Sequence, residues 1–255
     1  MTLSTLRMRR GWLLLMLLVP LTAQPAGDDA KAIVKAAIDY WRDVSSYTEA
    51  RMTIHRPDWD RTVSMRIWTR GEKESLVRVT APAKDAGNGT LLINKDMWSY
   101  NPKINRVIKI PSSLMTQNWM GSDFSNNDLA KADDLLTYYT HKLLQTSQRD
   151  GHTVYVIEST PQETAPVVWG KEVITVRDDY VLLGQDFYDQ QGVLVKQLKT
   201  LELKTLGGKV VATQQRMQNM DKPGEWTDVM VSEARFGVSL PAATFTLSNL
   251  RNPRD

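Results

Sequence analysis

Alternation of apolar and polar residues dominates this sequence from about residue 49 to residue 235. In one such segment Val63, Met65 and Ile67 are separated by Ser64 and Arg66. A period of two is typical of a β-strand with one buried face, and short polar turns between such segments indicate antiparallel neighbours. The pattern predicts a mainly β protein with about eleven or twelve strands.

Two stretches interrupt this pattern. Residues Asp29–Val44 place apolar side chains at helical spacing, which predicts one amphipathic helix near the start. The central stretch Pro111–Asp134 follows neither period, and Asp128–Leu136 within it is expected to form a short helix. A single, strongly curved antiparallel sheet with the first helix against its concave face accommodates all of these elements, because such a sheet needs a cover for its hollow.

The N-terminus has the features of a secretory signal peptide. Arg7, Arg9 and Arg10 precede the apolar run Trp12–Val19, and Leu21–Ala23 offers a cleavage site. We therefore expect residues 1–23 to be removed and residues 24–255 to form one exported, periplasmic domain. The chain contains no cysteine, which excludes a lipid-modified signal peptide, disulfides and thiolate metal sites.

Charge argues against a nucleic-acid partner. The net charge of +3 comes entirely from the three arginines of the leader, since residues 1–23 hold no acidic residue. The remainder has equal numbers of acidic and basic residues, whereas nucleic-acid binding needs a clustered basic surface.

Sequence motifs for catalysis or metal binding are not found. The three histidines, His55, His141 and His152, have no metal-ligand spacing, and Gly121-Ser122-Asp123 does not fit a nucleophile elbow. We expect no enzymatic activity, no cofactor and no metal site, although a hydrolase acting on envelope glycans or lipids stays open as a third alternative.

The stretch Asn118–Leu129 combines bulky apolar residues with turn-forming residues. Asn, Asp, Ser and Gly satisfy turns and helix caps, while large apolar side chains anchor a loop. A shaped, partly buried loop is expected, and on these residues alone a structural loop and a functional loop are equally favoured. The residues concerned are Trp119, Met120, Gly121, Ser122, Asp123, Phe124, Asp128 and Leu129.

Several segments resemble the LolA-like family, known as outer-membrane lipoprotein-sorting proteins. The most specific is Met120-Gly-Ser-Asp-Phe124, followed by Asp128-Leu129. Trp98–Pro102 and Asn105–Ile110 precede it, and Tyr188–Gly192 with Lys196 and the ending Phe245–Leu250 agree as well. In relatives the position of Ser99 and that of Asn101 are usually apolar.

This resemblance implies a half-open antiparallel β-barrel whose mouth is covered by the N-terminal helix and a helical loop. It implies periplasmic carriage of lipids or lipoproteins by their acyl chains, in outer membrane biogenesis, by a protein that we expect to be a monomer. An inner-membrane exporter of the RND/MMPL or ABC type is a possible partner. The alternative is an accessory scaffold of such an exporter that carries nothing. In LolA a barrel arginine holds the lid closed, and no motif here identifies its counterpart.

The alternation also predicts which side chains line the cavity. Inward-facing positions of the first three strands would lie opposite the apolar face of the helix. The predicted lining is Ile33, Ile38, Trp41, Met52, Ile54, Val63, Met65, Ile67, Val77 and Val79. For the loop, we expect Trp119, Met120 and Phe124 to plug the mouth, Gly121 to permit a bend, and Asp123 and Asp128 to cap backbone N–H groups.

Overall fold

A computed structural model describes residues 27–130 and 133–253, and the predicted signal peptide lies outside them. Its main element is one antiparallel sheet of thirteen strands, slightly more than the expected eleven or twelve. The strands are β1 (Ser45–Arg56), β2 (Trp59–Arg70), β3 (Glu74–Ala81), β4 (Gly89–Ile93), β5 (Asp96–Asn101), β6 (Arg106–Lys109), β7 (Tyr139–Arg149), β8 (His152–Pro161), β9 (Lys171–Arg177), β10 (Leu182–Tyr188), β11 (Leu194–Leu206), β12 (Lys209–Asn219) and β13 (Trp226–Phe236).

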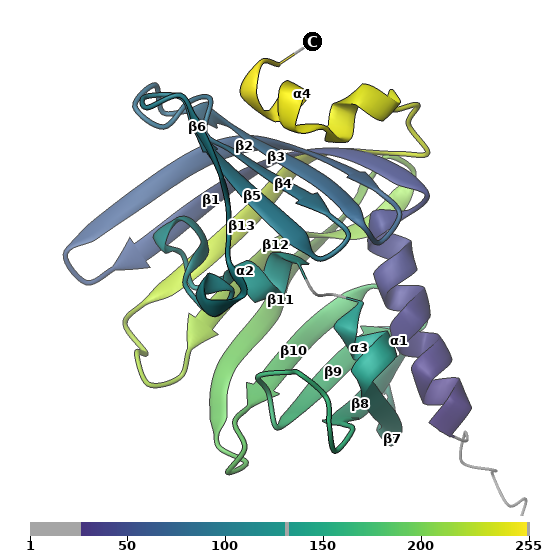
Figure 1. Cartoon of the computed structure of the whole chain (residues 1–255). Helices are drawn as coiled ribbons and strands as arrows, with labels where there is room; N and C mark the ends of the chain where they lie inside the picture. The colour runs from purple at the N-terminus through teal and green to yellow at the C-terminus, as the bar shows by residue number, and fades with distance from the viewer. Residues whose placement is uncertain (1–26, 131–132, 254–255) are drawn as a thin grey trace, which may run out of the picture.

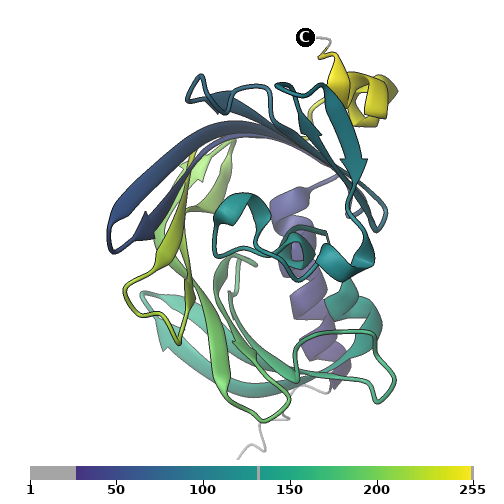
Figure 2. The same ribbon diagram turned by 60° about the vertical axis from the view of Figure 1, so that its left-hand side comes forward.

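The order of the strands explains the shape. The sheet runs β6-β5-β4-β3-β2-β1-β13-β12-β11-β10-β9-β8-β7, so that the first and last strands of the β-rich chain pair at its centre. Strands β6 and β7 form the two edges and are not paired with each other. The sheet curls around the helices of the central segment and the N-terminal helix without closing on itself (Figure 2), which confirms the predicted half-open barrel.

The N-terminal helix α1 (Gly27–Arg42) covers only one end of this sheet. It packs against β7, β9 and the short helix α3 (Asp134–Tyr138), with Ala30 and Val34 fully buried (Figure 1). It ends where Asp43 adopts a positive φ of 56°, a conformation common directly after a helix. The expectation that α1 faces the inward side chains of the first three strands was wrong.

Those strands are instead covered by the central loop. Their inward side chains form a core with Trp119, against which Met120 and Leu129 also pack. The reason is geometric: a curved sheet of thirteen strands is too wide for one helix to cover, so the loop covers the half that α1 leaves open. The core contains Ala50, Met52, Ile54, Val63, Met65, Val77, Val79, Val231 and Ala234.

A second cover, not predicted from the sequence, lies on the convex face of β2–β6. The chain ends in a 3₁₀ turn (Ala242–Phe245) and helix α4 (Leu247–Arg251), seen at the top of Figure 1. Phe245 and Leu250 pack on Leu76 and Leu91, which point outward from the barrel. At Gly89 a β-carbon would lie 2.6 Å from Leu250 Cδ1, so the absent side chain permits this close contact.

No helix in the described ranges is long and apolar enough to span a membrane.

Candidate functional site

We call residues 111–130 and 133–138 the lid, and these segments lie between the two halves of the sheet (Figure 2). It contains 3₁₀ turns at Ser112–Leu114 and Trp119–Gly121, then helix α2 (Asn126–Ala130) and α3. The hydroxyl of Ser125 accepts the N–H of Asp128 at 3.2 Å, and the carboxylate of Asp128 accepts the N–H of Ser125 at 2.6 Å. This reciprocal capping box fixes the start of α2, as expected for Asp128.

The bend before α2 depends on two residues with positive φ. Met120 has a φ of 54° and Gly121 a φ of 77°, and only glycine adopts this region without steric cost. The fully buried Ser122 closes the bend, because its hydroxyl donates to the carbonyl of Trp119 at 2.7 Å and accepts the N–H of Phe124 at 3.2 Å. Gly121 thus permits the bend, as its sequence context predicts.

Trp119 anchors the lid to the sheet. Its side chain is buried, and its indole N–H donates to Thr90 Oγ1 at 3.0 Å. A buried indole usually finds such a partner, which gives the ring a single orientation. Trp119 therefore holds the lid on the β3–β5 side of the hollow.

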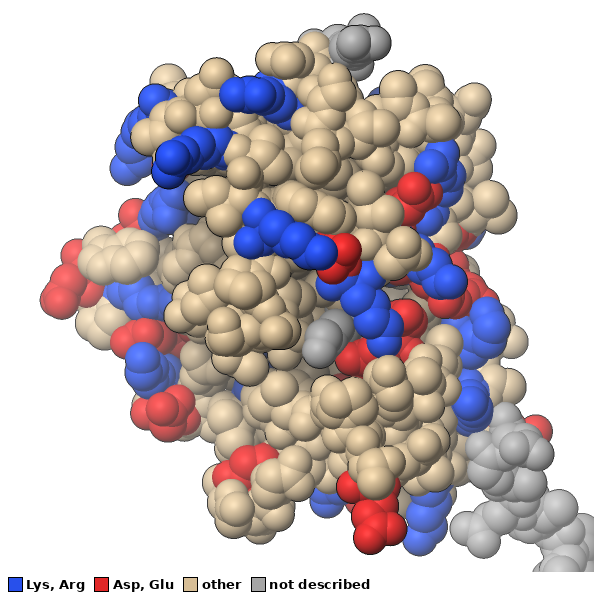
Figure 3. All heavy atoms as spheres, in the orientation of Figure 1, with Lys and Arg blue, Asp and Glu red and all other residues tan. Residues whose placement is uncertain are grey.

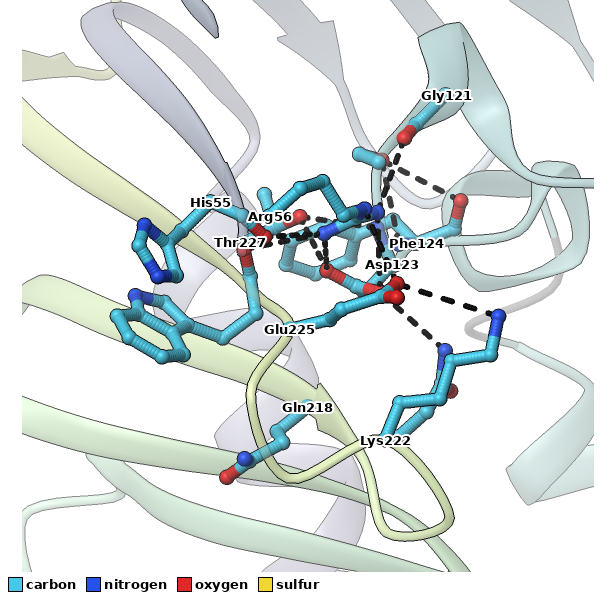
Figure 4. A network of polar contacts seen from close by, with 12 residues as sticks. His55, Arg56, Gly121, Asp123, Phe124, Gln218, Lys222, Glu225 and Thr227 are labelled. Carbon is cyan, nitrogen blue, oxygen red and sulfur yellow. Dashed lines mark hydrogen bonds and ion pairs between the residues drawn. The ribbon is translucent and has the colours of Figure 1, made fainter. Parts of the chain in front are cut away.

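An ion pair fastens the other side of the same bend. Arg56, at the end of β1, donates to the two carboxylate oxygens of Asp123 at 3.1 and 3.3 Å and to the carbonyl of Gly121 at 3.2 Å (Figure 4). The Asp123 side chain is 1% exposed and that of Arg56 is 12% exposed. Such a bidentate pair is geometrically specific, and it joins the lid to the barrel wall.

Three further side chains complete this network. The Thr227 hydroxyl donates to Asp123 at 2.7 Å, Asn219 Nδ2 donates to it at 3.2 Å, and Glu225 pairs with Arg56 at 3.2 Å. We call Arg56, Asp123, Asn219, Glu225 and Thr227 the lid latch. Its partners come from β1, β12, β13 and the loop between the last two. Asp123 was expected to cap backbone N–H groups, but its carboxylate is bound by side chains, and capping falls to Ser125 and Asp128.

An apolar cavity of about 280 Å³ lies between α1, the lid and strands β9–β12. This volume is close to the lower end of those typical of ligand pockets. The apolar and aromatic lining consists of Val34, Ala37, Ile38, Tyr40, Trp41, Phe124, Leu135, Tyr139, Val167, Val168, Trp169, Ile174, Tyr180, Val181, Leu182, Phe187, Leu198, Val211, Ala212 and Met217.

The residues predicted for the cavity lining and most of those predicted for the lid divide between three places. Ile38, Trp41, Phe124 and Asp128 line this cavity. Val77, Val79, Trp119 and Met120 border a second hollow of about 350 Å³ on the β3–β5 side of the lid. Val77, Val79, Trp119 and Met120 belong to the inner-strand core as well. The remaining residues pack in a core without bordering either hollow: Met52, Ile54, Val63, Met65, Ile67 and Leu129 with the inner strands, and Ile33 with the cluster that includes Ile157 and Ile174.

Ionisable groups lie at the cavity wall next to the lid. Asp128 pairs with Lys196, both largely buried, and Asp134 pairs with Lys95 at 3.0 Å. Along the seam between the two halves of the molecule, acidic and basic side chains lie next to one another (Figure 3). Glu172 also lines the cavity, and burial raises the pKa of its carboxyl to about 7. In the described ranges, no three His, Asp or Glu side chains gather as a metal site requires.

Two of these residues were missed by the sequence analysis. No sequence pattern pointed to Arg56 as a site residue, because its partner Asp123 is 67 positions away in an irregular loop. A sequence pattern did point to Glu172. It shares a strand face with Ile174 and Val176, and a carboxyl on an otherwise apolar face is unusual.

Comparisons with known proteins agree with this architecture. A family model described as an uncharacterized protein matches residues 71–252. A DUF1329 family protein from Desulfovibrio piger has 29% identity and a TM-score of 0.77, covering 87% of this chain and 98% of its own. No curated protein matches.

Two further solved structures share the fold. A putative outer membrane lipoprotein-sorting protein domain from Vibrio parahaemolyticus has 24% identity and a TM-score of 0.75, covering 88% of this chain and 99% of its own. A LolA superfamily protein from Nitrosomonas europaea has 23% identity and a TM-score of 0.69, covering 85% and 97%. The match of the family model over residues 71–252 shows that the chain belongs to this family of uncharacterized proteins, and the three solved structures show that it has the half-open barrel fold of LolA-like proteins.

Proposed function

We propose that this protein is a periplasmic carrier that binds acyl chains of lipids or lipoproteins in the cavity beneath its lid. The observation that carries the proposal is the cavity of about 280 Å³, lined mainly by aliphatic and aromatic side chains. Burial of an acyl chain is favourable by about 0.8 kcal/mol per CH₂ group, so a lining of this kind can hold a chain that water excludes.

The lid latch supports a carrier that opens and closes. The lid reaches the barrel wall through Trp119 on one side and through Asp123 on the other. Its short helices contribute little stability of their own, because isolated helices of this length are marginal. Breaking the Arg56–Asp123 contact would free the bend at Gly121 and open a route to the cavity.

The cavity also favours a carrier over a scaffold. An accessory subunit that uses its barrel only for rigidity would have its interior filled by side chains, because voids lower stability. Here the interior next to α1 is hollow. An exporter of the RND/MMPL or ABC type remains the predicted source or acceptor of the cargo.

A lipid-transfer assay tests the proposal. Donor vesicles with a self-quenching fluorescent phospholipid are mixed with unlabelled acceptor vesicles, with and without the protein beginning at Gln24. We expect the rate of dequenching to increase in proportion to protein concentration. A rate equal to that without protein, for phospholipids and for an acylated peptide alike, would contradict the carrier function.

A further inference from the structure

Glu172 places a buried carboxyl group in the otherwise mainly apolar lining of the cavity. It belongs to β9, it is 5% exposed, and it lines the cavity together with apolar neighbours such as Ile174 and Phe187. An ionised carboxylate in such surroundings is costly unless a positive charge compensates it. The groups that contact Glu172 therefore show whether the protein itself supplies the compensating positive charge.

Both hydrogen-bond partners of the Glu172 carboxyl among the described residues are neutral donors. Gln185 Nε2 donates to Glu172 Oε2 at 2.5 Å, and the hydroxyl of the buried Tyr139 donates to the same carboxyl. Two donors aimed at a carboxyl stabilise its charged form, which accepts hydrogen bonds. Among the described residues, however, no lysine or arginine pairs with Glu172.

The other carboxyls of the cavity lining show the contrast. Asp128 pairs with Lys196, and Asp134 pairs with Lys95. Each of them has a cation from the protein, whereas Glu172 has none. The arginine of the lining, Arg42, directs its guanidinium to the backbone carbonyls of Gly71 and Glu72. The cavity thus contains one carboxyl prepared for a positive charge that the described chain does not supply.

A second acceptor in the cavity lining also lacks a donor. The side-chain oxygen of Asn127, in α2, is buried and has no hydrogen-bond partner among the described residues. Buried polar atoms are nearly always hydrogen-bonded, so this oxygen calls for an N–H or O–H donor. The aromatic rings of the lining add faces that attract cations, among them Phe124 and Trp169. The ring of Phe187 already contacts the ammonium group of Lys196.

We propose that the cavity binds an amphiphile whose polar end is a protonated amine, with the ammonium group against Glu172 and the hydrocarbon part along the apolar lining. This inference rests on the proposed carrier function and names the class of its cargo. An ammonium supplies both the missing positive charge and hydrogen-bond donors, whereas a carboxylate or phosphate alone would be repelled.

Protonation of Glu172 would remove this recognition. Burial and the nearby Asp128 and Asp134 raise the pKa of Glu172 to about 7. Amine binding should therefore strengthen as the pH rises through 7, while an alkylamine stays protonated because its pKa is close to that of lysine, about 10.4. The charged and titratable groups of the elements around Glu172 are Tyr40 and Arg42 of α1, Asp128 of the lid, Asp134 of α3, Tyr139 and His141 of β7, Lys196 of β11, and Tyr180 between β9 and β10. His141 is buried and hydrogen-bonded to Ser159, and burial lowers the pKa of its imidazole, so it supplies no positive charge to Glu172 at pH 8.

Calorimetric titration with three ligands of equal chain length tests the proposal: decylamine, decanol and decanoate, each below its micellar concentration. The proteins are the wild type, Glu172→Gln and Glu158→Gln. Glu158 is a matched control, because it lies on the neighbouring strand β8 opposite Val173 and pairs with Lys171 away from the cavity lining. Decanol binding reports that each variant is folded with an intact cavity.

At pH 8 we expect decylamine to bind wild type and Glu158→Gln about tenfold more tightly than decanol, as one charge-assisted contact allows. Glu172→Gln should lose this preference and keep its affinity for decanol, and the wild-type preference should disappear at pH 5.5. Equal binding of decylamine and decanol by wild type, tighter binding of decanoate, or an unchanged preference in Glu172→Gln would overturn the inference while leaving the carrier function intact. Failure of all three ligands to bind would overturn both.

Discussion

The guanidinium of Arg56 binds both carboxylate oxygens of Asp123, at 3.1 and 3.3 Å, across 67 positions of sequence. Arg56 ends the first strand of the sheet, and Asp123 follows the bend of the lid. The pair is largely shielded from water, so it differs from exposed ion pairs of the same protein such as Arg66–Glu49. It joins the lid to the end of β1, and under the proposed function it is the polar contact that keeps the lid closed.

Replacing Arg56 should release the lid. Arg56→Leu leaves the buried Asp123 carboxylate without its cation, which should lower the free energy of unfolding by about 3 kcal/mol. Hydrogen exchange of residues 118–130 should accelerate more than that of the strands. Arg66→Leu is the control: its pair is exposed, so a change of about 0.5 kcal/mol or less is expected. Equal exchange of the lid in both variants would contradict the latch.

Substitutions of Asp123 distinguish an ion pair from a helix cap. If Asp123 were a cap, Asn would replace it at little cost, because Asn also caps well. As the partner of a buried guanidinium it cannot be replaced so easily. Asp123→Asn and Asp123→Ala should both lower the free energy of unfolding, by about 2 kcal/mol or more, as measured by denaturant titration. A nearly unchanged Asn variant would restore the cap interpretation.

Removing the cap at the start of α2 should lower the free energy of unfolding less than breaking the Arg56–Asp123 pair does. Ser125→Ala removes the hydroxyl that accepts the Asp128 N–H and should cost about 1 kcal/mol in thermal or urea unfolding. Ser147→Ala serves as control, since this half-buried strand residue has no side-chain hydrogen bond among the described residues. A loss no larger than that of the control would show that the capping box contributes nothing.

Stability should depend on pH through Glu172. Its folded-state pKa of about 7 exceeds the ordinary value of 4.5, so the carboxyl favours the folded state when protonated. Stability from this group is complete below pH 4.5 and declines as the pH rises to about 7. Glu172→Gln cannot ionise, and its free energy of unfolding relative to wild type should increase across this range by up to about 3 kcal/mol. A difference between the two proteins that is constant from pH 4.5 to 8 would show that Glu172 titrates normally.

Much of the fold was predictable because its physical causes are local. Alternation determines which side of a strand faces inward: Met52, Ile54 and Val63 were expected to face inward and to line the cavity, and they are buried in the core beneath the lid. The lining of the cavity was not predictable in this way. Whether an inward residue borders a hollow or packs in a core depends on where α1 and the lid dock on the wide sheet, and that choice is made by contacts distant in sequence.

The C-terminal cover and the lid latch also could not be predicted from local sequence patterns. Leu250 is buried against the convex face, although strands with one exposed face were expected there. Its close approach at Gly89 is a tertiary contact that no local pattern encodes. By contrast, Glu172 could have been noticed, because its place in an alternating strand put a carboxyl on the inward face.

Native mass spectrometry of the protein mixed with phospholipid in mild detergent tests the central claim most directly: the cavity beneath the lid holds the acyl cargo. Leu198→Trp places a large ring in the cavity, whereas Leu201→Trp alters an exposed residue of the same strand outside it. We expect a one-to-one lipid complex for wild type and Leu201→Trp, and none or far less for Leu198→Trp at equal thermal stability. Equal lipid occupancy of all three proteins would contradict the claim.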